Sequence, residues 1–378
     1  MKRILSLTLA LCLCLALFAC SGGSGSSSQA ESSQSGASES SQSSASESSQ
    51  EGQSESEESS QAPEKSSQAA ETSQEETGSA GHANVAALKG PTAMGMVKMM
   101  SDDAASGDPV YGFNIFASAD EITPKLVQGE LDLAAVPANL ASVLYNNTEG
   151  QVQVLAINTL GVLYIVENGD SIQSVADLKG KTIYASGKGS TPEYALRYLL
   201  SGNGIDPDAD VTIQWKSEHS ECVAALAADP AGIAMLPQPF VTTAQSQNEN
   251  LRVALDMTQE WDALAKENGS DAALLTGVVV ARKAFVEENP ETVEQFLSDY
   301  EASVAYTEED LEGAAKLIGE YDIVPEAVAQ KALPACNITL IRGEEMKAKL
   351  SAYLQTLMDQ NPKAIGGAMP GDDFYYAG

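Results

Sequence analysis

The stretch Thr182-Ile183-Tyr184-Ala185-Ser186-Gly187-Lys188-Gly189-Ser190-Thr191-Pro192 decides the class of fold. Its first four residues are β-prone and the glycine-rich part that follows has small side chains, while residues 193–200 carry apolar residues at helical spacing. Ser or Thr followed by Pro is a common helix start. A strand, a short loop and a helix in this order form half of a βαβ unit, so the stretch predicts an α/β protein.

The same alternation of apolar runs and helical runs continues on both sides of this stretch. Further strands are expected at residues 85–88, 111–117, 131–136, 152–166 with an interruption at Gly161, 211–215, 232–236, 251–257 and 274–281. Further helices are expected at residues 92–100, 124–128, 139–145, 220–228, 290–305, 308–321, 325–331 and 343–359. The polar and aromatic end, residues 369–376, is expected to dock on the folded body.

Composition excludes several classes of protein. The chain of 378 residues has 21 Lys and Arg against 53 Asp and Glu, a formal net charge of −32, and this field repels nucleic-acid phosphates. Its two histidines are too few for a three-histidine zinc site, so no metal site is expected. Residues 83–378 exceed what one hydrophobic core usually spans, which predicts two lobes.

The N-terminal residues 1–19 are interpreted as the signal peptide of a bacterial lipoprotein. Lys2 and Arg3 precede an apolar run over residues 4–18, shorter than the roughly 20 residues of a membrane span. The run ends in Leu17-Phe18-Ala19-Cys20, which resembles a lipobox, where the cysteine thiol is acylated. An ordinary signal peptide with a chance cysteine is the alternative.

Residues 20–82 are expected to be the lipidated cysteine and a disordered tether. Ser, Gln, Glu, Gly and Ala dominate, and such a segment buries too little apolar surface to offset its backbone entropy. Its r.m.s. reach is about 40–45 Å. The expected location is therefore extracytoplasmic, anchored by lipid to the cell membrane, with a Gram-positive type of cell favoured. Disorder without a spacer role is the alternative.

The folded part keeps two cysteines, Cys222 and Cys336. They are able to pair in an oxidising compartment, but Cys222 lies in a helical pattern and Cys336 follows Pro334-Ala335. Two buried thiols are therefore favoured over a disulfide.

Two loops each follow an expected strand and open an expected helix. They are Gly90-Pro91-Thr92-Ala93-Met94-Gly95 and the segment from Gly187 to Thr191. Helix N-termini carry unpaired N–H groups and partial positive charge, and small residues let a ligand approach them. Simple helix caps are the alternative.

Neither a phosphate loop nor a nucleophile–base set is found, so no enzyme and no cofactor are expected.

Several motifs resemble those of the extracytoplasmic substrate-binding proteins of NitT/TauT-type ABC transporters, which serve nitrate, aliphatic sulfonate, taurine and thiamine-pyrimidine uptake. They are Asp177-Leu178-Lys179-Gly180-Lys181-Thr182-Ile183, Gly189-Ser190-Thr191, Gly232-Ile233-Ala234-Met235-Leu236-Pro237-Gln238-Pro239, and Val280-Ala281-Arg282 with Phe285-Val286-Glu287-Glu288-Asn289-Pro290.

The resemblance implies a two-lobed Venus-flytrap fold of the type II periplasmic binding proteins, each lobe a mixed sheet flanked by helices. Residues 83–160 and 277–378 would form lobe I and residues 161–276 lobe II. Leu160, Gly161, Thr276 and Gly277 would form the hinge. A monomer would bind a small polar organic solute between the lobes and deliver it to a permease that works with a cytoplasmic ATPase.

The resemblance also implies a set of ligand-binding residues in the loops of the cleft. They are Gly90, Pro91, Thr92, Met94, Pro137, Ala138, Asn139, Asn158, Ser186, Gly187, Ser190, Thr191, Pro237 and Gln238. None of the four arginines after residue 82 falls in these loops, and Lys188 is the cationic candidate, with a solvated loop charge as its alternative. The ligand class stays open between anionic and heteroaromatic solutes.

Two other classes of function compete with solute delivery. One is a lipoprotein sensor, and the other is an enzyme on the same fold, of the kind that makes the thiamine pyrimidine. The sequence lacks a second signalling domain, the cysteine-rich motif of that enzyme and a nucleophile with its base.

We expect Cys20→Ala to release the protein from membranes, because the anchoring lipids attach to this thiol. Fractionation after salt and carbonate washing measures the effect. A variant that stays with the membrane would rule out the lipobox interpretation.

Overall fold

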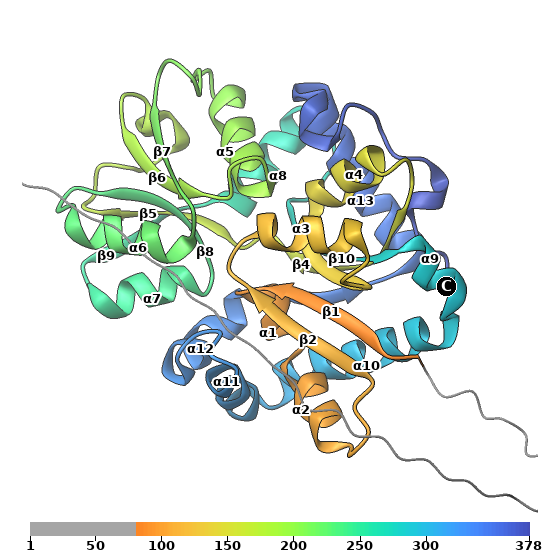
Figure 1. The fold of residues 1–378 in the computed structure, drawn as a ribbon. Helices are drawn as coiled ribbons and strands as arrows, with labels where there is room; N and C mark the ends of the chain where they lie inside the picture. The colour runs from red at the N-terminus through yellow and green to blue at the C-terminus, as the bar shows by residue number, and fades with distance from the viewer. Residues whose placement is uncertain (1–80) are drawn as a thin grey trace, which may run out of the picture. The chain divides into compact units, whose positions relative to one another are not determined.

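The computed structural model describes residues 81–378, in which the chain forms two mixed β-sheets flanked by helices (Figure 1). The expected signal peptide, Cys20 and the expected tether up to residue 80 lie outside the described residues. In sheet order, the first sheet contains β11 (Ile338–Ile341), β4 (Val152–Leu160), β10 (Leu275–Arg282), β3 (Leu133–Pro137), β1 (Ala83–Leu88) and β2 (Tyr111–Phe116). The second contains β7 (Thr212–Lys216), β6 (Thr182–Ser186), β8 (Ile233–Pro237), β5 (Leu163–Asn168) and β9 (Leu251–Asp256).

The two sheets repeat one strand order. β2-β1-β3-β10-β4 in the first corresponds to β7-β6-β8-β5-β9 in the second. In each, the first three strands are parallel and the fourth is antiparallel to both of its neighbours. We call each sheet with its helices a lobe, and the expected two-lobed α/β fold is confirmed. The chain passes between the sheets after Leu160 and returns before Leu275; the lobe boundaries and the hinge at residues 160–161 and 276–277 stay predictions.

The described helices cover the sheets. They are α1 (Pro91–Met94), α2 (Val97–Ala105), α3 (Ala119–Gln128), α4 (Ala138–Asn147), α5 (Thr191–Gly202), α6 (His219–Ala228), α7 (Phe240–Gln247), α8 (Met257–Glu267), α9 (Lys283–Glu288), α10 (Pro290–Glu309), α11 (Leu311–Glu320), α12 (Glu326–Ala332) and α13 (Gly343–Gln360), with short 3₁₀ turns η1 (Val175–Leu178), η2 (Leu333–Ala335), η3 (Pro362–Ile365) and η4 (Asp372–Phe374). Within residues 81–378, no helix has the length and apolarity needed to cross a bilayer.

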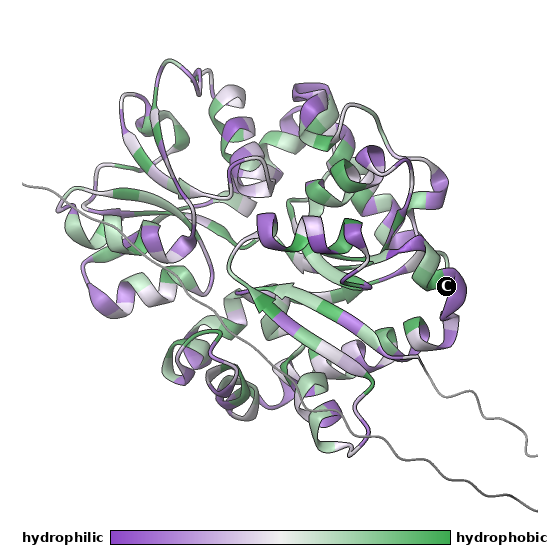
Figure 2. Cartoon of the chain, in the orientation of Figure 1, coloured by the Kyte–Doolittle hydropathy of each residue, from purple (hydrophilic) through white to green (hydrophobic). Residues whose placement is uncertain are grey.

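Hydropathy follows burial in this arrangement. Figure 2 shows the interior strands largely green and many helices divided between green and purple. β3 and β8, each inside its sheet, are buried at every residue, as expected for strands covered on both faces.

Three differences from the expected elements have local causes. α3 begins at Ala119 instead of residue 124, because Ser118 and Glu121 form a capping box ahead of Pro124. The strand expected to reach residue 257 stops at Asp256, whose carboxylate accepts hydrogen bonds from the amides of the next turn and so starts α8. α7, α8, α9 and β11 were not expected. The sequences of α7 and β11 lack a clear periodicity.

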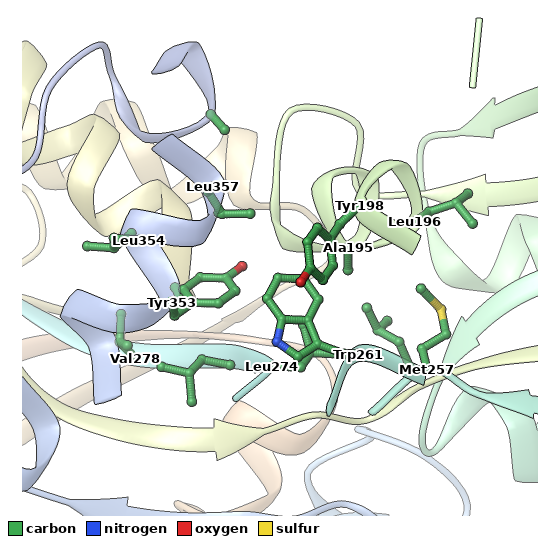
Figure 3. Close-up of a cluster of buried hydrophobic side chains, with 14 of the residues drawn as sticks. Ala195, Leu196, Tyr198, Met257, Trp261, Leu274, Val278, Tyr353, Leu354 and Leu357 are labelled. Carbon is green, nitrogen blue, oxygen red and sulfur yellow. The ribbon is translucent and has the colours of Figure 1, made fainter. Parts of the chain in front are cut away.

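A buried aromatic cluster joins the two lobes on one side. Figure 3 shows Trp261 of α8 between Tyr198 of α5 and Tyr353 of α13. The ring centroid of Trp261 lies 4.2 Å from that of Tyr198 and 5.7 Å from that of Tyr353. Its indole N–H donates to the carbonyl oxygen of Ala272 at 2.7 Å, so this large side chain is buried with its polar group satisfied.

Polar side chains fasten the same side of the lobes. The hydroxyls of Thr191 and Tyr353 are 3.0 Å apart, and the Thr191 hydroxyl donates to Asn139 Oδ1 at 3.3 Å. Asn139 Nδ2 donates to the carbonyl oxygens of Ala364, at 2.9 Å, and Gly189, at 3.4 Å. We call Thr191, Asn139, Tyr353 and Trp261 the inter-lobe seam. All four side chains are fully buried.

The C-terminal segment docks on the first sheet, as expected. Phe374 is fully buried, the Tyr145 hydroxyl donates to Asp373 Oδ1 at 2.6 Å, and the amide of Tyr376 donates to the carbonyl oxygen of Val154 at 2.9 Å. Cys222 and Cys336 are buried free thiols, which confirms that two buried thiols, and not a disulfide, are present in the folded part.

We expect Trp261→Ala to lower the free energy of unfolding by about 3–5 kcal/mol, because it opens a large cavity in the seam. Urea unfolding of the full chain, followed by circular dichroism, measures the change. Val127→Ala is the control, because this side chain is 54% exposed and its loss costs roughly 0.5 kcal/mol or less. Equal stability of both variants would contradict the role given to the seam.

Candidate functional site

A cavity of about 440 Å³ lies between the two lobes, where loops from both sheets meet. Its walls are three pairs of loops that hold corresponding places in the repeated strand order: those after β1 and β6, after β2 and β7, and after β3 and β8. The carboxyl ends of parallel strands share one edge of a sheet, and ligands of open α/β sheets bind beyond that edge. The fold therefore directs both sets of loops to one space.

Most of the expected site residues line this cavity. Gly90, Pro91, Thr92, Pro137, Ser186, Gly187, Ser190 and Pro237 do so, as do the cationic candidate Lys188 and the expected hinge residue Thr276. Their contact with a ligand stays a prediction.

Six expected site residues lie outside the lining. Met94 and Ala138 are fully buried in the hydrophobic cores. Asn158 donates through Nδ2 to the Tyr300 hydroxyl at 3.1 Å, and Gln238 Oε1 accepts from the Thr242 hydroxyl at 2.9 Å.

Asn139 and Thr191 are the other two, and both belong to the inter-lobe seam. The Thr191 hydroxyl thus neither caps its helix nor faces the cavity. Its sequence position at a helix start could not reveal this partner, because Tyr353 is distant along the chain.

The site residues expected from the sequence did not include the loops after β2 and β7. Ser118, Ala119 and Asp120 follow β2, and Ser217, Glu218 and His219 follow β7; all six line the cavity. A signal was present, because each loop places a serine before a glutamate at the start of a helix. Trp215 and Phe240 also line the cavity, whereas Trp261 is in the seam.

Three helices that start at the cavity are capped by their own glutamates. Glu121 accepts from the amide of Ser118 at 3.2 Å, Glu193 from the amide of Gly189 at 2.7 Å, and Glu221 from the amide of Ser217 at 2.8 Å. These carboxylates take up amides that a bound anion would need, and they place negative charge at the positive helix ends. That the helix start after β6 supplies donors to a ligand stays a prediction, with the Gly189 amide already bound to Glu193.

The loop after β6 follows a path that requires glycine. Gly187 and Gly189 have φ angles of 78° and 80°, a region that other residues rarely adopt. The turn brings the Gly189 amide to Glu193, whose carboxylate also pairs with Arg197 at 2.9 Å.

Lysines dominate the charge of the lining. Lys89 lies 3.6 Å from the exposed Asp322, Lys216 lies 5.6 Å from the centre of the Tyr184 ring, and the exposed Lys188 forms no ion pair with residues 81–378. The two acids of the lining are Asp120 and Glu218. No arginine lines the cavity, because the four arginines of the described part pair with carboxylates elsewhere.

His219 lies in the first turn of α6 and faces Ser186 at the end of β6. Its Nδ1 is 2.6 Å from the Ser186 hydroxyl, and its ring lies 5.0 Å from that of Phe240. Burial lowers the pKa of His219 to about 4, so the imidazole is neutral at physiological pH. Burial also raises the pKa of the neighbouring Cys222 thiol to about 11, and this group stays protonated.

The cavity lining contains a buried side-chain oxygen that lacks a partner. Thr276 Oγ1 is the one side-chain polar atom in residues 81–378 that is buried without a hydrogen bond to them. Such an atom costs about 1–3 kcal/mol. In the same part of the chain, no group of three His, Cys, Asp or Glu is placed to hold a metal ion.

Comparison with known families identifies the chain's class. Residues 107–323 match the family of periplasmic substrate-binding proteins of phosphonate ABC transporters. The chain belongs to this family. It is an extracytoplasmic solute-binding protein that delivers its ligand to the permease of an ABC importer, as expected. The family consists of binding proteins and not of enzymes, and the sensor and enzyme alternatives are not favoured. The search of curated proteins returned no match.

Solved structures share the fold. An ABC transporter protein from Parabacteroides distasonis has 21% sequence identity and a TM-score of 0.64, over 78% of this chain and 98% of that one. The periplasmic aliphatic sulphonate binding protein of Escherichia coli has 18% identity and a TM-score of 0.62, over 79% and 92%. The nitrate-binding protein of Synechocystis PCC 6803 has 16% identity and a TM-score of 0.53, over 66% and 69%. At these identities the likeness establishes the fold alone.

We expect Thr276→Val to weaken ligand binding without lowering the stability of the free protein. The substitution removes an unpaired buried hydroxyl and keeps the branched shape, so the free energy of unfolding stays equal or rises. Urea unfolding and titration calorimetry measure the two effects. Thr307→Val is the control: its hydroxyl donates to the carbonyl oxygen of Val304 at 2.7 Å, so only stability should fall. Loss of stability with unchanged affinity in Thr276→Val would refute a ligand role.

Proposed function

We propose that the protein captures a small organic anion, of the sulfonate or phosphonate type, in the cavity between the lobes. The observation that carries this proposal is the charge of the lining: Lys89, Lys188 and Lys216 face one space against two acids. In a chain whose net charge is −32, a cavity with an excess of lysines is a departure from the average surface and favours an anion.

The size and the aromatic side chains of the cavity favour an organic ligand. A volume of about 440 Å³ falls in the range of pockets for small organic molecules and far exceeds an inorganic oxyanion. Trp215 and Phe240 add apolar surface to the wall formed by the second lobe. The anionic group would lie near the lysines, and the organic part near these two rings.

The narrower assignment is to the NitT/TauT-type binding proteins, supported by the motifs around Asp177, Gly189 and Gly232 and by the sulphonate and nitrate binding proteins among the similar structures. We further propose a monomer held by lipid on Cys20 and a tether over residues 20–82. Lobe II would span residues 161–276 and move on a hinge of Leu160, Gly161, Thr276 and Gly277.

At the expected hinge, Gly161 is held by a hydrogen bond and has no room for a side chain. Asn337 Nδ2 donates to the carbonyl oxygen of Gly161 at 2.6 Å, and a Cβ on Gly161 would lie 2.2 Å from Thr258 Oγ1. Because the seam fastens one side of the lobes, opening would have to occur mainly on the side of the cavity away from Trp261 and Tyr353.

A thermal-shift screen of the full chain in detergent tests the ligand class. The solutes are alkyl and aryl sulfonates, phosphonates, nitrate and sulfate, with choline, amino acids and pyrimidines for comparison. We expect organic anions to stabilise the protein, by about 2.7 kcal/mol at a hundredfold excess over Kd. Lys188→Gln should weaken that binding, while Lys363→Gln, a lysine outside the cavity lining, serves as the control. Stabilisation by neutral or cationic solutes alone would refute the anion proposal.

A further inference from the structure

Three features together distinguish His219 from the other residues of the described chain. It is one of two histidines in the chain, it lines the cavity, and one of its ring nitrogens is fixed by Ser186. Its second nitrogen, Nε2, forms no hydrogen bond with residues 81–378. Since Thr276 Oγ1 is the one polar side-chain atom buried there without a partner, Nε2 has accessible surface, and it belongs to a residue that lines the cavity.

Few charged groups surround the ring. β7 contributes Lys216, β6 contributes Tyr184, and α6 itself contributes Glu221 and Cys222, with Glu218 immediately before it. α7 and β8, which pack against α6, carry no titratable side chain. No neighbouring charge, only burial, accounts for the neutral state of the imidazole.

Several other donors near the cavity are engaged, although the Thr276 hydroxyl is not. One amide just ahead of each of α3, α5 and α6, that of Ser118, Gly189 or Ser217, is bound to Glu121, Glu193 or Glu221. The hydroxyls of Thr92 and Ser190 donate to the carbonyl oxygens of Leu88 and Gly187, each at 2.8 Å. A solute that enters therefore meets an imidazole nitrogen whose orientation is fixed, beside flexible ammonium groups.

We propose that His219 is a specificity-determining residue: Ser186 donates to Nδ1, and Nε2–H donates a hydrogen bond to an oxygen of the anionic solute. This inference rests on the proposed function. A bound anion favours a proton on the ring, so binding below neutral pH takes up a proton at His219 and affinity rises as the pH falls. A solute that instead donated to Nε2 would bind more weakly as the pH falls.

The probes are ethanesulfonate and benzenesulfonate, because a sulfonate remains an anion between about pH 5 and pH 8 and any pH dependence belongs to the protein. Titration calorimetry on the full chain in detergent compares the original protein with His219→Leu, His219→Gln and the exposed His82→Gln. We expect His219→Leu to bind about tenfold more weakly or worse, as for loss of a hydrogen bond to a charged group. His219→Gln should recover part of the affinity, because its amide donates, without the rise in affinity at low pH. His82→Gln should match the original protein.

A second measurement, which does not depend on affinity, follows the histidine rings directly by NMR. With ¹⁵N-labelled histidine, we expect the His219 ring to show the Nε2–H tautomer in the free protein and to shift on addition of either sulfonate, while His82 does not.

Four results would each overturn the inference. They are an Nδ1–H tautomer, sulfonate affinity that decreases as the pH is lowered, sulfonate affinity that is unchanged in His219→Leu, and no shift of the His219 signals with either sulfonate. The proposed function is judged separately by the screen. If another organic anion stabilises the protein but the sulfonates leave His219 unaffected, the inference fails and the proposed function stands.

Discussion

The hydrogen bonds of Thr191 with Asn139 and Tyr353 join the two lobes at a fully buried point. Each group is buried, so a lobe displaced at this point would leave hydroxyl and amide groups without partners, at about 1–3 kcal/mol each. Trp261 adds apolar surface on the same side. This contact keeps the carboxyl ends of β1 and β6 facing each other, and the cavity lies between them. Each loop of the lining faces loops of the other lobe only while that placement holds.

The second constraint is electrostatic. In many α/β proteins, the positive ends of helices receive an anionic ligand directly. Here Glu121, Glu193 and Glu221 place carboxylates at those ends, which stabilises the helices and opposes an anion there. In a protein with a net charge of −32, the long-range field opposes the approach of an anion, so attraction of the proposed ligand would have to come from lysines close to the site.

The site could be predicted in part. Gly90, Thr92, Gly187 and Ser190, which line the cavity, could be named because a strand, small residues and a helix in series mark the edge where loops of an α/β sheet gather. The loops after β2 and β7 were missed, although their serine and glutamate repeat the same helix-start signal, because no glycine marked them. His219 could not be singled out, since the residue that fixes it, Ser186, belongs to another strand.

The sequence by itself determined the alternation of strands and helices, the two lobes, the buried free thiols and the class of transport protein. These properties follow from the local periodicity of apolar residues, from composition and from short motifs, which are readable without knowing what lies nearby in space. Tertiary structure alone decided which polar groups face the cavity. Thr191 and Ser190 are neighbours in the chain, yet one hydroxyl lies in the inter-lobe seam and the other residue lines the cavity. Side-chain direction and the partner across the lobes set that difference, and neither is encoded in local spacing.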